Sequence, residues 1–273
     1  MAKQKVERFY DRISKIYDNL YNDQYWRLYQ KTTWENLKKH LPRDLSAKIL
    51  DIGGGTGFWT IKIAKSGYNI VLADISSGML EKAEKNCEIE KVSSKVTFEK
   101  CDICNMTQFT DNTFDLVISE GDPISSCSNP KKAVEEIYRV TKTPGKTVCS
   151  VDNKLGAIHY FLERGKLKEL EKFLKTGWSR WLTDEQKEQF DVKFFSPDEI
   201  KSIFEKAGLI SKEVDLEENS QLTTEQVIIK FLIEKLFGIK FDLFSNDYQN
   251  AQKELETREY PDPNNQQSRS EGF

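Results

Sequence analysis

Three observations predict that this chain adopts an α/β fold, with a doubly wound and mostly parallel sheet that carries helices on both faces. Short apolar runs alternate with stretches of helical periodicity, which is typical of parallel strands joined by crossover helices. Four glycines lie within residues 53–57, directly after the first apolar run, and Asp74 ends the second run 21 positions after Gly53. In such a sheet a ligand lies against a glycine turn, and the carboxylate at the next strand end accepts hydrogen bonds from ribose hydroxyls. We therefore expect a ligand that contains a nucleoside.

The predicted elements follow one another in the order that this fold requires. Strands are expected at residues 48–52, 69–73, 96–99, 114–119 and 147–151, with a sixth near residues 210–216. Helices are expected at residues 58–66, 78–87, 131–140 and 223–237, and Ser76 and Ser77 are expected to cap the second of them. A closing antiparallel strand has three alternatives: it lies at residues 240–244, it lies near Phe273, or it is missing.

The spacing of the glycines decides which nucleoside ligand is expected. Gly53, Gly55 and Gly57 stand at alternate positions and Phe58 follows, so the Gly-x-Gly-x-x-Gly fingerprint of dinucleotide sites and the Gly-Lys-Ser/Thr of phosphate loops are both missing. Asp51, just before the glycines, suits a cationic ligand better than a pyrophosphate. These residues resemble the first motif of the class I, Rossmann-like S-adenosylmethionine (SAM) methyltransferases, in which an acidic residue precedes three alternating glycines.

The resemblance continues in the same order over about residues 6–216. Within the family, the chain is similar to the small-molecule branch of "methyltransferase domain 11/25" proteins. The resemblance is carried by Phe-Asp-Leu-Val-Ile-Ser at 114–119, Ala-Val-Glu-Glu-Ile-Tyr-Arg-Val at 133–140, Pro-Gly-Lys at 144–146, and the last crossover helix at 194–209. It implies an enzyme that uses SAM as cofactor, releases S-adenosylhomocysteine (SAH), and transfers the methyl group to a small-molecule acceptor by in-line displacement without a metal.

The resemblance also implies which residues hold the cofactor. The glycine turn would pass the amino-acid part of SAM, Asp74 would bind the ribose, Asp102 would accept from the adenine amino group, and Ile103 would pack on the ring. The implied cofactor-binding residues are Tyr17, Asp51, Gly53, Gly54, Gly55, Gly57, Asp74, Ile75, Met79, Asp102, Ile103 and Glu120. No catalytic residue is identified, and the candidates are Tyr17, which matches a tyrosine near the methyl group in the family, and His159, a conceivable general base.

The predicted domains are an N-terminal helical lid at 1–45, the SAM-binding core at 46–153, a helical substrate cap at 154–195, the end of the core with a C-terminal helix at 196–260, and a tail at 261–273 that is expected to be disordered. In the lid, one helical face carries Val6, Phe9, Tyr10, Ile13, Ile16 and Tyr17. The apolar helical cap is expected to end at Gly177. Trp178, Arg180 and Trp181 belong either to its core or to an acceptor-stacking surface.

A second interpretation within the same fold uses a metal. Asp122 follows the fourth strand, and Asp152 and Asn153 follow the fifth, where catechol-type methyltransferases hold Mg²⁺ with oxygen ligands. The rest of the chain resembles the metal-independent branch, so no metal is expected. Cys101-x-x-Cys104 lacks the partners that a zinc site needs, and Cys127 lacks an identifiable activating base, so these thiols are expected to pack.

Composition excludes some acceptors. With 273 residues, a net charge of −3 and a pI near 5.7, the chain has no global field for nucleic acid. Acids interleaved with the aromatic and basic residues of the N-terminal segment, such as Glu7 and Asp23, argue against a nucleic-acid stacking surface there. Glu-Gly-Asp-Pro-Ile at 120–124 replaces the Asn/Asp-Pro-Pro-Tyr/Phe of methyltransferases that act on base amino groups or glutamine, although other nitrogen acceptors stay open.

The compartment is predicted from the cysteines and the N-terminus. We expect a cytoplasmic enzyme, because the five cysteines lack small-domain spacing and the chain shows no apolar leader and no membrane-length apolar run. A monomer or homodimer is expected. The alternatives in function are an RNA or protein methyltransferase, and a non-catalytic SAM-binding regulator.

Overall fold

The computed structural model describes residues 2–180 and 190–209. They belong to the first of the two compact units into which the chain divides, Met1–Val214 and Asp215–Phe273. Five expectations lie outside the described residues: Trp181, the sixth strand at 210–216, the helix at 223–237, the closing strand, and the tail.

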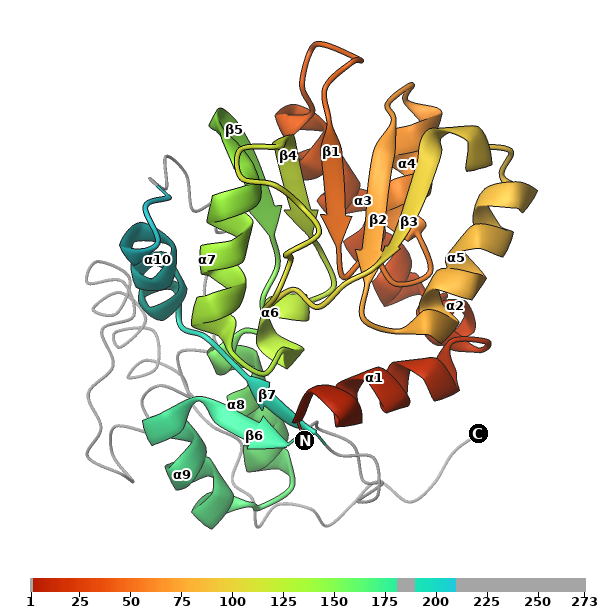
Figure 1. Ribbon diagram of the computed structural model, residues 1–273. Helices are drawn as coiled ribbons and strands as arrows, with labels where there is room; N and C mark the ends of the chain where they lie inside the picture. Colours follow the sequence, from red (N-terminus) through yellow and green to blue (C-terminus); the bar gives the residue numbers. More distant parts are fainter. Residues whose placement is uncertain (1, 181–189, 210–273) are drawn as a thin grey trace, which may run out of the picture. The chain divides into compact units, whose positions relative to one another are not determined.

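The sheet of the described unit has five strands, all parallel, in the order β3-β2-β1-β4-β5 (Figure 1). They are β1 (Ile49–Ile52), β2 (Ile70–Asp74), β3 (Val96–Lys100), β4 (Phe114–Ser119) and β5 (Thr141–Cys149). This confirms the predicted doubly wound α/β fold. The boundary of β5 differs, because the strand begins at Thr141 and not at residue 147. Its register with β4 shifts between Phe114 and Leu116, so Pro144 and Gly145 lie within the strand, at an irregularity in its pairing.

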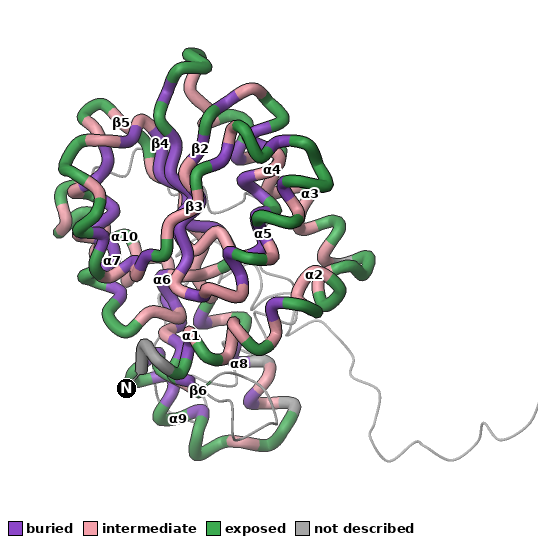
Figure 2. The backbone as a smooth tube through the Cα atoms, turned by 45° about the vertical axis from the view of Figure 1, so that its right-hand side comes forward, coloured by how far each residue is buried: buried purple, intermediate pink, exposed green. Residues whose placement is uncertain are grey.

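Helices cover both faces of this sheet because the strand side chains alternate between two cores. On one face, Ile49 packs with side chains of α3 (Gln24–His40), α4 (Phe58–Lys65) and α5 (Ser77–Ile89). On the other face, Leu50 and Ile52 pack with α7 (Pro130–Val140) and α10 (Pro197–Lys206). Buried residues follow β2 and β4 in Figure 2, which places the core along the centre of the sheet.

The N-terminal helices α1 (Ala2–Ile13) and α2 (Tyr17–Leu20) lie at the edge where the strands end (Figure 1). Val6 is buried, as its apolar face predicts, but α1 ends at Ile13. The prediction that Ile16 shares the buried face is therefore wrong: a turn separates α1 from α2, and Ile16 is 52% exposed.

The segment after β5 begins with two helices, α8 (Lys154–Glu163) and α9 (Leu167–Thr176), as the sequence predicts. It then forms a small antiparallel sheet that the sequence analysis missed, in which β6 (Trp178–Arg180) pairs with β7 (Asp191–Lys193). Gly177 ends α9 in the left-handed region, φ 66°, where a β-carbon would lie 2.7 Å from the carbonyl oxygen of Phe194. Trp178 is 38% exposed and does not belong to the cap's core.

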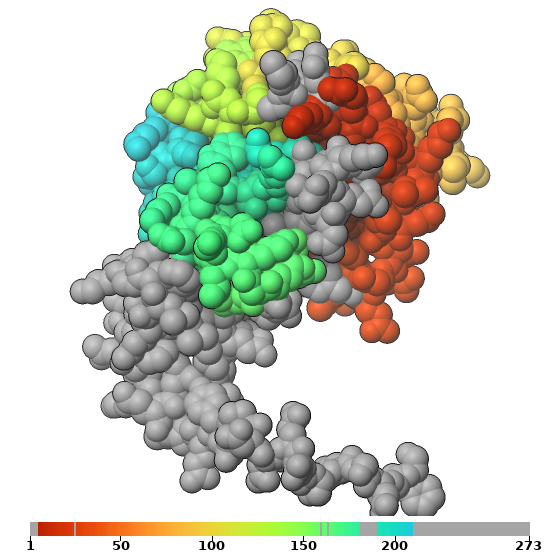
Figure 3. Space-filling view, turned by 90° about the horizontal axis from the view of Figure 1, so that it is seen from below, coloured from red at the N-terminus to blue at the C-terminus, as the bar shows by residue number. Residues whose placement is uncertain are grey.

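The lid and the cap meet on one face of this unit. Figure 3 shows the N-terminal residues beside residues of the cap on the side at which the strands end. The contact includes Phe190, just before β7, whose ring centroid lies 5.4 Å from that of Phe9 in α1. Within the described ranges, no helix is both long and apolar enough to cross a membrane.

Candidate active site

A cavity of about 1150 Å³ lies at the carboxyl edge of the sheet. Side chains of the N-terminal lid line it together with residues that follow the strands. One lining residue for each strand end, in spatial order from β3 to β5, is Asp102, Asp74, Gly55, Asp122 and Asp152. Ligands bind at this edge in doubly wound sheets, so the cavity stands where the fold places an active site.

The turn between β1 and α4 needs glycine for two different reasons. Gly53 has φ +77°, and a β-carbon there would lie 2.3 Å from Cγ of Pro123, so the Pro123 side chain already occupies the space that a side chain at residue 53 would need. Gly55 has φ +55°, and a β-carbon there would meet nothing within 4 Å, so the position is open to the cavity that it lines. The Gly55 amide donates to Oδ2 of Asp74 at 2.9 Å, which joins the turn to the end of β2.

Asp74 lies in this cavity, only 7% exposed. Its Oδ1 accepts from the Ser76 amide at 2.8 Å and its Oδ2 accepts from Gly55. Burial raises the pKa of Asp74 to about 6, against the lowering effect of these bonds. The side chain is thus largely ionised at neutral pH, as an acceptor of ribose hydroxyls should be.

The predicted adenine end lies next to it. Asp102 and Ile103 line the cavity after β3, and Oδ1 of Asp102 accepts from the Cys104 amide at 2.9 Å. Ile75 and Met79 line the same region. A fixed carboxylate beside apolar side chains suits a planar base with an exocyclic amine, so the residues present fit the adenosine of SAM.

Asp51 differs from its prediction, because it does not line the cavity. It is fully buried beneath the turn, where its Oδ2 accepts from Oγ1 of Thr60 at 2.6 Å and its Oδ1 has no hydrogen-bond partner among the described residues. Burial raises the pKa of Asp51 to about 7. Asp51 therefore supports the glycine turn from below and does not contact a ligand in the cavity.

Two aspartates that the sequence analysis did not single out fix the lid on the core. Oδ1 of Asp11 accepts from the Ser76 hydroxyl at 2.6 Å and the Gly78 amide at 2.9 Å. Asp18 accepts from Oγ1 of Thr56 at 2.6 Å and from Nδ2 of Asn86 at 3.1 Å. The signal for both was a repeated Tyr-Asp pair, 10–11 and 17–18, of which the first lies in α1 and the second in α2.

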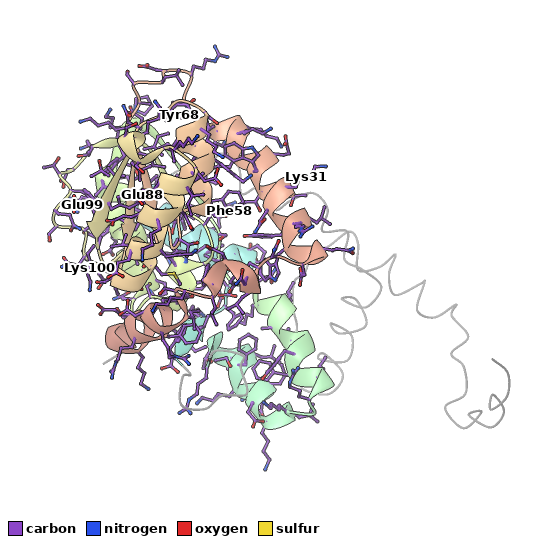
Figure 4. All side chains as sticks on the ribbon, turned by 90° about the vertical axis from the view of Figure 1, so that its right-hand side faces the viewer. Lys31, Phe58, Tyr68, Glu88, Glu99 and Lys100 are labelled. Atoms are coloured by element: carbon purple, nitrogen blue, oxygen red, sulfur yellow. The ribbon has the colours of Figure 1, made fainter. Side chains whose placement is uncertain are left out.

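An ion pair adds to this attachment. Lys100 at the end of β3, labelled in Figure 4, lies 2.7 Å from Oε1 of Glu7 in α1. The lid is thus bonded to the ends of β2 and β3, to the glycine turn and to α5.

The tyrosine of each Tyr-Asp pair lines the cavity. Tyr10, Tyr17, Tyr21, Trp26 and Tyr29 form what we call the aromatic wall, all of them lining residues. Successive ring centroids lie 6.3, 4.7, 4.6 and 5.6 Å apart. Burial raises the pKa of all four tyrosines, so their hydroxyls stay neutral at physiological pH.

Two carboxylates lie across from this wall, after β4 and β5. Asp122 takes a left-handed conformation, φ 64°, and its amide donates to Oγ of Ser150 at 3.1 Å. The Asp152 amide donates to Oγ of Ser125 at 2.8 Å. Burial raises the pKa of both carboxyls, and the charge of Asp122 raises that of Asp152 further. Glu120, 8% exposed, lines the cavity beside them.

The magnesium interpretation finds limited support in this arrangement. Oδ1 of Asn153 accepts from the Leu155 amide at 2.8 Å and caps α8, so it already has a structural role. No group of three or more His, Cys, Asp or Glu side chains gathers for a metal within residues 2–180 and 190–209.

Comparison with known proteins gives this architecture a family. Residues 49–145, from β1 into β5, match the family model described as "Methyltransferase domain". A SAM-dependent methyltransferase from Methanosarcina mazei superposes with a TM-score of 0.54 at 21% identity, over 63% of this chain and 82% of that one. The chain therefore carries a methyltransferase domain with the Rossmann-like fold of the SAM-dependent methyltransferases.

The curated relatives of this chain differ in what their names say they act on. The tRNA 5-carboxymethoxyuridine methyltransferase of Escherichia coli is 26% identical over 161 residues, 58% of this chain and 60% of the relative. A demethylmenaquinone methyltransferase of Lactiplantibacillus plantarum is 31% identical over 153 residues, 53% of this chain and 61% of the relative. The chain thus spans about three fifths of the length of these curated relatives.

The structure describes some of the remaining candidate site residues and not others. Tyr17 lines the cavity, whereas the side chain of His159 lies outside the described part of the structure. Cys101 is buried, as a packing thiol should be. Cys104 hydrogen-bonds with Cys127, which lowers the pKa of Cys104 to about 7, so its neighbour in space is not its neighbour in the Cys-x-x-Cys motif.

Proposed function

We propose that this protein transfers the methyl group of SAM to a small-molecule acceptor by in-line displacement. The observation that carries the proposal is a single cavity with two kinds of lining: the residues that fit adenosine, and a separate aromatic and acidic end beneath the lid. When bound, SAM supplies a sulfonium whose methyl carbon is electrophilic. The protein's part is to hold cofactor and acceptor in line and to exclude water.

Each cofactor group has a residue that would hold it. Asp74 would accept from the ribose hydroxyls, Asp102 would accept from the adenine amine, and Ile103 would pack on the ring. The amides and open surface of the glycine turn would take the amino-acid part. Tyr17 would close the cavity over the reacting atoms from the lid side.

A small acceptor is favoured over a polymer by charge. A polymer-reading enzyme needs a basic track for phosphates. Among the described residues the cations that line the cavity are Lys62 and Lys65, and Lys65 forms an ion pair with Glu90. The chain's net charge is −3.

Acceptor choice would reside mainly in the lid. In the described part of the chain no side chain of α8 or α9, the helices of the predicted substrate cap, lines the cavity, whereas five aromatic side chains of the lid do. The cap would act through the lid, by the contact of Phe190 with Phe9.

The test is calorimetry with SAM and SAH, followed by transfer from methyl-labelled SAM into separated small-molecule and tRNA fractions. We expect binding of both ligands and label in the small-molecule fraction. Label in tRNA, with binding that weakens steeply with salt, would support the function named for the Escherichia coli relative instead. Binding of SAM without formation of SAH in any fraction would indicate a non-catalytic regulator.

Transfer is proposed to proceed without a divalent metal. Activity should survive EDTA, because the motifs resemble the metal-independent branch and Asn153 is engaged as a helix cap. Loss of activity on chelation with rescue by Mg²⁺ would favour the site at Asp122, Asp152 and Asn153.

A further inference from the structure

We infer that the methyl acceptor carries an amine, which enters the cavity as a cation and is methylated on nitrogen. This inference rests on the proposed function and names the substrate class of the same site. Two surfaces that meet at one end of the cavity carry it: the aromatic wall of the lid, and the carboxylates of Asp122 and Asp152.

The aromatic wall is the first surface. Five aromatic side chains follow one another at centroid separations of 4.6 to 6.3 Å along one side of the cavity. Groups of electron-rich rings bind ammonium groups through the negative potential of their π faces. The tyrosine hydroxyls of the wall stay neutral, so its attraction for a cation would come from the π faces and not from a phenolate charge.

The carboxylates are the second surface, and the sheet places them together. Ser119 of β4 pairs with Cys149 of β5, and each aspartate follows three residues later in its chain segment, so both leave the sheet at the same level. None of the ion pairs among the described residues includes Asp122 or Asp152. Two half-buried carboxylates near each other and without a cation are unfavourable. A cationic ligand would relieve that repulsion.

The two lining cations are engaged on α4. Lys65 pairs with Glu90 of the neighbouring helix. Lys62 lies over the rings of Phe58 and Trp34, 5.0 and 5.5 Å from their centroids, and Phe58 is labelled in Figure 4. The acceptor end therefore has an excess of negative charge, which disfavours a carboxylate or phosphate beside the methyl group. A neutral quinol could stack on the wall but would leave the carboxylates uncompensated.

The same carboxylates balance the reaction. A protonated amine has no lone pair, so it must lose one proton before it attacks. Asp152, whose pKa is raised by burial and by Asp122, is suited to accept that proton. The nitrogen lone pair then forms the new N–C bond as the C–S bond breaks, and the electron pair of that bond stays on sulfur as SAH. The product leaves as a methylated ammonium ion, and Asp152 later releases its proton to water.

The experiment compares three ligands of one shape on the SAH-loaded protein: 2-phenylethylamine, 2-phenylethanol and 3-phenylpropionate, measured by calorimetry or competition. We expect the amine to bind at least about tenfold more tightly than the alcohol, and the carboxylate to bind weakest. In a variant with both Asp122→Asn and Asp152→Asn, amine and alcohol should bind within about twofold of each other. The matched control is Glu88→Gln, which removes an exposed carboxylate of α5 and should keep the preference.

Three results separate the possible failures. Equal binding of amine and alcohol, or a preference that persists in the double variant, overturns the inference. Failure of SAH to bind the wild-type protein overturns the proposed function itself. If SAH binds and methyl label moves to oxygen or carbon acceptors but to no amine in an amine library, the proposed function stands and the inference is wrong.

Discussion

The two ends of the cavity are built in different ways. The cofactor end takes its residues from short contiguous segments at the ends of β1, β2 and β3, and its polar groups bond to one another, as Gly55 does with Asp74. The acceptor end is assembled from the lid and from the residues after β4 and β5, and none of the ion pairs in the described ranges includes Asp122 or Asp152.

The difference teaches which part of an enzyme is fixed by its cofactor. Enzymes that share a cofactor must all bind the same ligand, so a local motif with local hydrogen bonds is sufficient to form the cofactor site. The acceptor varies, and its site is supplied by side chains on an attached segment that can change without disturbing the sheet.

The largest expected effect is at the cofactor end. Asp74→Ala should weaken binding of both SAM and SAH by about 100-fold, since hydrogen bonds to a charged group contribute roughly 1.5–3 kcal/mol each. Calorimetry measures the affinities, and circular dichroism checks the fold, with Glu88→Gln as the control. Unchanged affinity would remove Asp74 from the ribose site and erase the distinction between the two ends.

Two glycines of one turn should respond differently to substitution by alanine. Gly53→Ala should lower the free energy of unfolding by about 2–4 kcal/mol, because it adds left-handed strain and a clash with Pro123. Gly55→Ala should lower it by only about 1 kcal/mol, from strain alone. Its main effect should be on SAM affinity, because the new methyl group enters the cavity. Urea unfolding and calorimetry separate the two effects, and similar behaviour of both variants would contradict this account of the turn.

Asp51 offers a test through pH. Its pKa is about 7 in the folded protein and 3.8 is its ordinary value, so the folded state binds the proton more tightly. The group therefore favours folding most below pH 3.8, and this contribution is lost as pH rises through about 7. The free energy of unfolding of the wild type, relative to Asp51→Asn, should fall over this window by up to about 1.4 kcal/mol per pH unit. Parallel pH profiles for the two proteins would show that burial does not perturb this carboxyl.

The smallest expected effect is at the lid attachment. Asp18→Ala removes bonds from Thr56 and Asn86, but the carboxylate is 39% exposed, so about 1 kcal/mol and a roughly fivefold loss of SAM affinity are expected. Glu35→Ala on α3, an exposed carboxylate with an ion pair to Lys38, is the matched control. A loss as large as that of Asp74→Ala would mean that the lid belongs to the cofactor end.

The sequence analysis predicted the fold, and its misses have physical causes. Asp51 belongs to the motif, but strand alternation turns its side chain beneath the turn, toward Thr60. The hairpin of β6 and β7 was missed because three-residue strands leave almost no periodicity to detect. The sequence shows the aromatic residues of the lid, but it does not show that they line one cavity.

By itself, the sequence determined the parallel sheet, the glycine turn, and the carboxylates at the ends of β2 and β3, because apolar periodicity and backbone conformation are local properties. Only the tertiary structure decided that Tyr10, Tyr21 and Tyr29 line the same cavity as Asp122 and Asp152. Those residues lie about a hundred positions apart in the chain. They come together because strand order brings β4 beside β5 and because Asp11 and Asp18 bond the lid to the core. No window of sequence contains that information.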